Sequence, residues 1–274
     1  MPIEAIHAQG DYPATELLIP LGLLLNFGLL LCRMTGILTF LPIPGIKSGL
    51  EVHRLAIAVL FSILLLPWAP AANRQLFSLG EIVRSAASEA ILGLALGLCV
   101  ALIQEGIQLA AQMVGLQAGF SYASTIDPSS NADSAILQVL MTLGSSLLFL
   151  ALGLDTVLFR FLLLGVYTVP PGQWALTTQK ASAVMALFPP LFVDGIRCAL
   201  PVVAILLVID TALALLSRIQ PQLQLLTLSF PLKMLAAIVF LAYGTPLLPG
   251  VLERSSLRSM DTVQILLASP DQNR

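Results

Sequence analysis

Apolar runs long enough to form membrane-spanning helices constrain this chain more than any other feature. The run over residues 17–41 has about the length that a helix needs to cross a hydrocarbon core of ~30 Å. Two later runs, 81–114 and 134–169, are longer than one simple crossing. Only 10% of the 274 residues are charged, whereas about 25% is usual for a soluble domain. We therefore predict an all-α membrane protein, or one whose surface is covered by other apolar chains.

Proline and glycine divide the remaining apolar sequence into shorter segments, which predicts kinked helical hairpins rather than a row of straight spans. The run 55–68 is short for a full crossing, so we expect it to pack against other protein. The first sixteen residues contain no Lys or Arg, so they lack the positive region of a secretory signal, and the first apolar run is expected to be retained. The predicted parts are a polar lead (1–16), a helical part (17–193), a helical hairpin (194–250) and a polar, mobile tail (251–274).

A stripe of small and polar residues marks the run 81–114. Glu89, Gly93, Gly97, Ala101 and Glu105 recur every four residues, and Gln108 and Gln112 continue the series. Small residues at this spacing allow helix backbones to approach closely in membranes. The stripe is interpreted either as a tight helix–helix seam, which we favour, or as a face that lines a hydrated conduit.

Charged side chains inside the apolar runs need a partner or a route to the surface, because an unpaired charge is expensive at membrane depth. Arg33 lies in the second half of its run, and we expect it to snorkel toward a nearby end. Lys233 is expected to face a partner subunit or a polar seam, and Asp210 to make a polar contact with another helix. Asp194 and Arg197 are three residues apart and could pair on one helix.

The stretch 115–128 interrupts the apolar sequence with glycines, aromatic rings and a closing Asp-Pro pair. Its marked residues are Gly115, Gly119, Phe120, Ser121, Tyr122, Asp127 and Pro128. The glycines loosen the backbone, and proline pushes the preceding residue out of the helical region. Two interpretations remain open. The rings either anchor a loop at a membrane interface or on the protein's own core, or they act as a stopper in a loop folded into a cavity.

Several chemistries have no support in the sequence. The net charge of −2 argues against nucleic-acid binding, and no Gly-rich phosphate loop with Lys-Ser or Lys-Thr is present. Two histidines and three scattered cysteines cannot assemble a metal cluster at the usual spacing. No Gly-x-Ser-x-Gly elbow occurs, and Asp155 follows Leu154 rather than the glycine expected in an intramembrane aspartyl protease. We therefore predict a protein that is not an enzyme and that uses no metal or cofactor.

Four landmarks occur in order along the chain. They are Arg33 on a helix followed by Pro42, the loop 115–128 ending in Asp-Pro, the turn Pro170-Pro171-Gly172, and Arg218 with Pro221-Gln222 followed by Pro231 and Lys233. Over residues 17–250 the chain thereby resembles the FliR/SctT family of membrane subunits of the bacterial type III export gate, with flagellar FliR favoured. Residues 227–233 also resemble the Thr-Leu-x-Phe-x-Pro-Lys motif of FliQ.

The resemblance implies an architecture and partners. It implies a FliP-like part over 17–193 with a central plug loop at 115–128, then a FliQ-like hairpin over 194–250. It also implies a hetero-oligomeric pore with FliP-like and FliQ-like subunits, and contact with FlhB-like and FlhA-like export components. The expected location is the bacterial inner membrane, in the flagellar basal body. The residues expected to serve packing or assembly are Arg33, Glu89, Gly93, Gly97, Glu105, Arg218, Pro221, Gln222, Pro231 and Lys233.

The predicted function is that of a pore-forming subunit that helps unfolded flagellar proteins cross the inner membrane, with the loop closing the idle channel. An alternative from another class is a secondary transporter for a small solute. Such transporters often carry inverted repeats, and no convincing repeat relates the two halves of this chain.

Overall fold

The regular secondary structure in the described part of the chain is all helical, as predicted. The computed structural model describes residues 14–41, 52–70, 78–120, 136–219 and 225–268, and it contains no strand in these ranges. The helices are α1 (Ala14–Phe40), α2 (Val52–Leu65), η1 (Leu66–Trp68), α3 (Leu79–Ala118), α5 (Ile136–Ala151), α6 (Leu154–Thr168), α7 (Thr178–Met185), α8 (Phe188–Ile219), α9 (Leu225–Gly244), η2 (Thr245–Leu247) and α10 (Leu248–Leu267).

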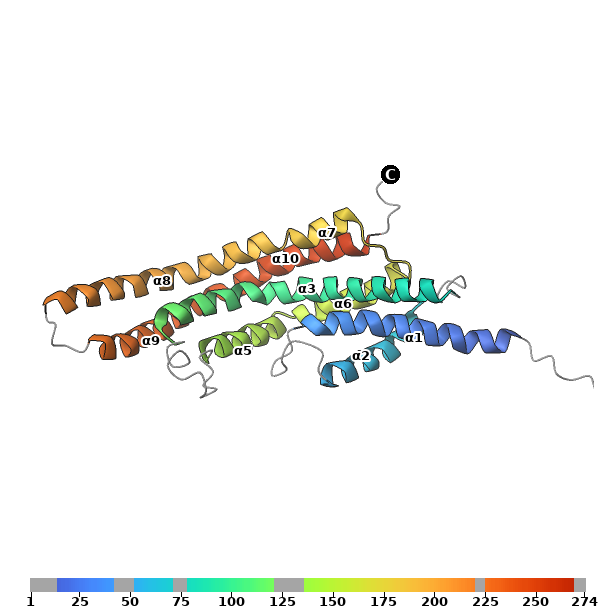
Figure 1. Cartoon of the computed structure of the whole chain (residues 1–274), viewed down its shortest axis with the longest axis horizontal. Helices are drawn as coiled ribbons and strands as arrows, with labels where there is room; N and C mark the ends of the chain where they lie inside the picture. Colours follow the sequence, from blue (N-terminus) through green and yellow to red (C-terminus); the bar gives the residue numbers. More distant parts are fainter. Residues whose placement is uncertain (1–13, 42–51, 71–77, 121–135, 220–224, 269–274) are drawn as a thin grey trace, which may run out of the picture.

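Helix α3 is the axis of an elongated bundle. It runs along the middle of the molecule, with α8 on one side and α1 on the other (Figure 1). It also contacts α5, α9 and α10. At 1.5 Å per residue its 40 residues extend about 60 Å, twice the thickness of a hydrocarbon core. One apolar core surrounds the N-terminal part of α3, and a second one joins its C-terminal part to α8 and α9.

The C-terminal region forms two long antiparallel arms. The first arm is α7 followed by α8, and the second is α9, η2 and α10 in succession (Figure 1). Among the described residues, four stretches are long and apolar enough to cross a membrane: Gly22–Phe40, Leu79–Ala118, Thr178–Ile219 and Ser229–Leu267. Pro201 and Pro231 lie inside α8 and α9, where each removes one backbone hydrogen bond.

Residues 251–267 do not form part of the mobile polar tail that we expected over 251–274, and residues 269–274 lie outside the described residues. The residues up to Leu267 belong to α10, which packs against α3, α6 and α7. The buried positions Leu252, Ser256, Ser259, Val263 and Leu266 repeat with the helical period, so the helix has one packed face despite its low apolar content. The hairpin therefore extends well beyond residue 250.

The run 134–169 is divided, whereas the sequence suggested one long segment. Helix α5 ends at Ala151 and α6 begins at Leu154. Gly153 between them has φ of +69°, a left-handed conformation that glycine adopts without the penalty of a side chain. The short run 55–68, by contrast, forms α2 and η1 close to its expected bounds.

Helix α3 continues into the stretch 115–128, which we expected to be a loop from its first residue. Gly115 lies buried in the last turn of α3, and the helix ends at Gly119, whose φ is +85°. The N–H of Phe120 donates to Gly115 O at 3.0 Å, and that of Gly119 to Leu116 O at 3.2 Å, which is the Schellman pattern of a helix C-terminus. Ser121, Tyr122, Asp127 and Pro128 lie outside the described residues.

The small residues of the α3 stripe place α1 and α3 in backbone contact. A Cβ added to Gly97 would lie 2.5 Å from Ile37 O, and one added to Gly93 would collide with Arg33 O. In the opposite direction, a Cβ on Gly36 of α1 would lie 2.8 Å from Ala90 O. None of these three positions has room for a side chain without a shift of the backbone.

The stripe does not continue along one face, however. A four-residue step turns a helix about 40° past a full turn, so the four steps from Glu89 to Glu105 add about 160°. Glu89 is completely buried against α1, whereas Glu105 is exposed beside α8. The expected single seam is therefore limited to the N-terminal half of α3.

We predict that Gly97→Ala destabilises the chain by about 1–3 kcal/mol, because overpacking forces the two backbones apart. The matched control is Gly28→Ala in α1, where an added Cβ meets nothing within 4 Å. That change should be neutral or favourable, since Gly inside a helix costs about 0.5–1 kcal/mol relative to Ala. Unfolding of the purified chain in detergent measures both effects, and equal stability of the two variants would contradict the seam.

Candidate functional site: polar nodes along the central helix

A buried ion pair joins α1 to α3 near the glycine contact. Arg33 Nε lies 2.5 Å from Glu89 Oε2, and the two side chains are 2% and 0% exposed. The guanidinium has turned inward, so our expectation that Arg33 snorkels to a helix end is wrong. Gly93, which lies against the Arg33 backbone, explains this inward turn. Because the two backbones approach closely there, both charges are enclosed at the α1–α3 contact.

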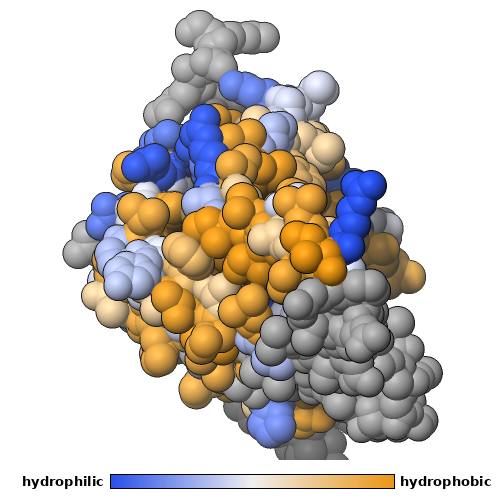
Figure 2. All heavy atoms as spheres, turned by 90° about the vertical axis from the view of Figure 1, so that its left-hand side faces the viewer, coloured by the Kyte–Doolittle hydropathy of each residue, from blue (hydrophilic) through white to orange (hydrophobic). Residues whose placement is uncertain are grey.

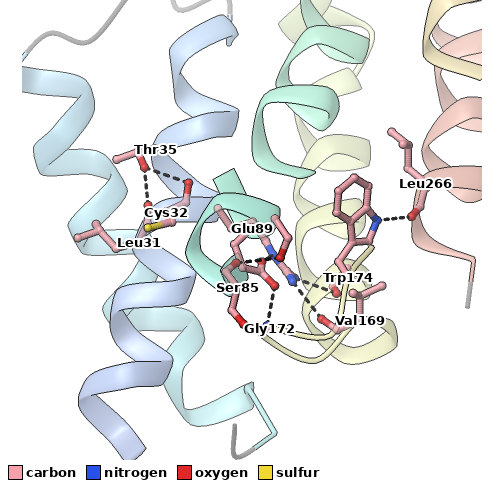
Figure 3. Close-up of polar contacts among 12 residues, drawn as sticks. Leu31, Cys32, Thr35, Ser85, Glu89, Val169, Gly172, Trp174 and Leu266 are labelled. Atoms are coloured by element: carbon pink, nitrogen blue, oxygen red, sulfur yellow. Dashed lines mark hydrogen bonds and ion pairs between the residues drawn. The ribbon is translucent and has the colours of Figure 1, made fainter. Parts of the chain in front are cut away.

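Arg33 and Glu89 use their remaining donors and acceptors at the C-terminal end of α6 and on the turn that follows it. Arg33 Nη1 donates to Gly165 O and Nη2 to Val169 O, both at 3.1 Å. The N–H of Gly172 donates to Glu89 Oε1 at 2.7 Å (Figure 3). Gly172 has φ of +83°, which suits glycine at this turn. We call Arg33, Glu89 and these three backbone groups the α1–α3–α6 node.

The same turn is fastened to α10. Trp174 Nε1 donates to Leu266 O at 3.0 Å, near the C-terminal end of that helix (Figure 3). The Lys180 ammonium lies 5.1 Å from the centre of the Trp174 ring, within the range of a cation–π contact. The α1–α3–α6 node is thus linked through one turn to the last helix of the chain.

A second, more open node lies at the other end of α3. Lys233 Nζ of α9 is 2.9 Å from Asp210 Oδ1 of α8, and Gln117 Nε2 of α3 donates to Asp210 Oδ2 at 3.1 Å. The side chains of Lys233 and Asp210 are 13% and 38% exposed. We call these three residues the α3–α8–α9 node. The charge of Lys233 is therefore paired within the chain, at a polar contact between helices.

A third ion pair connects the two C-terminal arms. Arg258 Nη1 of α10 lies 2.7 Å from Asp194 Oδ2 of α8. The predicted pairing of Asp194 with Arg197 is therefore wrong. Its true partner lies 64 residues away, in the segment that the sequence suggested was a mobile tail.

The remaining predicted residues are dispersed. Arg218 is exposed in the last turn of α8, Pro231 lies in α9, and Glu105 faces a groove beside α8. Pro221 and Gln222 lie outside the described residues. Within the described ranges, no three His, Cys, Asp or Glu side chains gather in a way that could hold a metal ion.

Sequence reasoning missed Arg54, which is also almost completely buried. Its Nη1 donates to Thr39 O at 3.1 Å and to Leu38 O, so it satisfies carbonyls in the last turn of α1. Gln117 was also missed as a member of the second node. Both are ordinary polar residues at helix ends, and their partners are distant in sequence, so no local spacing could reveal them.

A known protein family matches a range of the chain that includes the residues of both nodes. The profile of the bacterial export proteins, family 1, matches residues 24–258. The chain belongs to this family. The FliR/SctT resemblance drawn from the sequence landmarks is thereby confirmed, and this member of the bacterial export proteins is an all-α membrane protein.

Several relatives share one name and come from different bacteria. The Flagellar biosynthetic protein FliR of Escherichia coli (strain K12) is 28% identical over 218 residues, which cover 80% of this chain and 83% of the relative. The protein of that name from Bacillus subtilis (strain 168) is 27% identical over 250 residues, covering 88% and 94%. That from Aquifex aeolicus (strain VF5) is 22% identical over 216 residues, covering 79% and 83%.

We predict that Arg33→Met and Glu89→Gln each destabilise the chain by about 3–5 kcal/mol, because each leaves an uncompensated buried charge. The double variant should lose much less than the sum. Arg84→Met, at an exposed position of α3, is the control for removing an arginine. Unfolding in detergent gives the double-mutant cycle, and additive losses would show that the two side chains are not coupled.

At the α3–α8–α9 node we predict that Lys233→Met lowers recovery of the assembled complex and lowers export, because it leaves Asp210 without its cation. Adding Asp210→Leu to Lys233→Met should restore part of the assembly, since neither charge then remains. Arg254→Met, exposed on α10, controls for loss of a positive charge. Co-purification and secretion assays measure the outcome, and normal assembly of the Lys233→Met protein would count against the node.

Proposed function

We propose that this protein is a pore-forming subunit of the flagellar type III export gate and helps unfolded flagellar proteins cross the inner membrane. The observation that carries the proposal is the uncovered apolar surface of the C-terminal arms. In the apolar stretch of Thr178–Ile219 only 17% is buried within the chain, and in that of Ser229–Leu267 only 11%. The corresponding share for Leu79–Ala118 is 50%.

The exposed apolar side chains of α8 recur along the helix rather than standing singly. Leu200, Leu207, Val208 and Leu215 are all more than half exposed along α8. The view onto the end where α8 leads toward α9 is apolar over most of the described surface (Figure 2). Large exposed apolar patches mark a membrane or a protein partner. With relatives named for flagellar biosynthesis, we assign the partners as FliP-like and FliQ-like subunits, with FlhB-like and FlhA-like components nearby.

The rival function is a secondary transporter for a small solute. It predicts a chain that works alone or as a homo-oligomer and binds its solute at a site within the chain. The export-gate proposal predicts a purified native complex with several different membrane subunits. The composition of that complex, determined by mass spectrometry, distinguishes the two. A monomer that binds a small solute would overturn the gate.

The proposal includes closure of the idle pore by the stretch 115–128, and the geometry at its start refines which residues would close it. Phe120 packs against the second apolar core, which includes Ala118, Val202 and Leu206. Gly119 abuts the ring of Phe230, since an added Cβ would lie 2.7 Å from that ring. Phe120 therefore anchors the stretch to its own chain, and the proposed closure falls to residues after it, above all Tyr122.

We predict that Tyr122→Ala and Phe120→Ala act differently. Phe120→Ala should lower stability by part of the ~3–5 kcal/mol that a buried Phe→Ala change costs. Tyr122→Ala should leave assembly intact and make the membrane leak ions, because a ring in a constriction helps exclude water. Conductance of cells that express the assembled gate measures the leak. An assembled Tyr122→Ala gate that stays tight would refute closure by this residue.

A further inference from the structure

A groove between α3 and the start of α8 combines apolar walls with a row of polar side chains. Glu105, Gln108 and Gln112 lie along α3, about one helical turn apart, and Phe188, Leu191 and Phe192 face them from α8. The groove is open to the outside and holds about 340 Å³. That is the volume of roughly ten waters in the liquid, which suits inserted side chains better than a whole helix.

Two glycines bring α3 and α8 together beside the groove. A Cβ on Gly195 would lie 2.9 Å from Gly106 O and 2.9 Å from a Leu109 methyl. The backbones are therefore in direct contact, and the groove lies between two helices that cannot move apart without losing this packing. Parallel ridges separated by a groove of this kind are the surface against which a further helix packs.

The groove has an uncompensated charge. No lysine or arginine lines it, and Glu105 takes part in none of the three ion pairs among the described residues. The Phe192 side chain beside it is 52% exposed, so apolar wall and carboxylate face the same space. A bare carboxylate at membrane depth is costly, and in proteins such groups pair with a cation.

The buried carboxylate of α3, Glu89, shows how this helix satisfies such a charge. Glu89 receives Arg33 from α1, an apolar helix that carries that single cation in its second half and packs at glycine positions. Glu105 is exposed, unlike Glu89, but it too has a glycine next to it and apolar side chains around it, with an open groove in place of a neighbouring helix. The element that would correspond to α1 is missing within the described chain.

We propose that an apolar helix of another gate subunit packs over this groove and inserts side chains into it, and that this helix carries one Lys or Arg that pairs with Glu105. Gln108 and Gln112 donate and accept hydrogen bonds along the same contact, and Phe188 and Phe192 cover the apolar flank. The inference rests on the proposed function, because it needs an assembly of different membrane subunits. It adds the site, its chemistry and the class of partner.

Two measurements on the native complex test the inference. A photo-crosslinking amino acid at Phe192 should link to a membrane subunit, and mass spectrometry should place the linked peptide in an apolar helix that carries a Lys or Arg. Glu105→Lys should weaken association by about tenfold or more, which corresponds to about 1.4 kcal/mol. Changing the identified cation to Glu in the partner should restore assembly of the Glu105→Lys protein, which misfolding of that variant could not explain.

Glu81→Lys is the matched control, because it introduces the same charge at an exposed position in the first turn of α3. It should assemble normally. Normal assembly of Glu105→Lys, a crosslink only to exported polypeptide, or a crosslink only to lipid would overturn the groove as a subunit contact. If the unmodified protein purifies without any other membrane subunit, the proposed function fails as well, so the two failures can be told apart.

Discussion

The arrangement of this chain depends on the burial of one positive charge. Arg33 is enclosed beside α3, where a guanidinium without partners would be strongly destabilising. Glu89 neutralises it, and carbonyls of the α6 end accept its remaining N–H groups. Because both charged groups have lost water, their geometry fixes α1, α3 and the turn at Gly172 relative to one another. The glycines of α3 contribute to the same arrangement, since they let α1 and α3 approach closely beside the pair.

The polar nodes of α3 differ in enclosure, and the difference matches their surroundings. The α1–α3–α6 node is sealed within the larger core, and Trp174 extends it to α10. Asp210 of the α3–α8–α9 node is more than a third exposed, and the node lies where the two arms leave the rest of the bundle. Salt and water reach the second node more easily, so it holds α8 and α9 together less rigidly. The chain thus has a more enclosed end and a more open end.

Sequence patterns predicted the helices of this fold better than the contacts between them. The length and composition of the apolar runs indicated an all-α membrane protein, and the four-residue spacing at Gly93 and Gly97 pointed to a site where helices do approach closely. The same spacing was misleading further along α3, because 40° per step carries Glu105 to another face. The prediction of a mobile C-terminal tail failed for a different reason. Its average polarity hid a helical period in which serines fill buried positions against α3 and its neighbours. Ion pairs such as Asp194 with Arg258 could not be found locally, since a nearer arginine offered an equally good spacing.

Pairing within the chain also bears on how such an apolar hairpin can be inserted and held. Asp210 and Lys233 face each other across α8 and α9, so these two charges can meet as a neutral pair before any other subunit is present. Each charge alone would cost about 2.5–3.5 kcal/mol at the centre of a membrane helix, and the ion pair removes much of that cost for both. Glu105 has no such partner among the described residues, although it lies on the same central helix. The chain therefore satisfies the charges needed for its own fold and leaves a carboxylate and two apolar arms for contacts outside it.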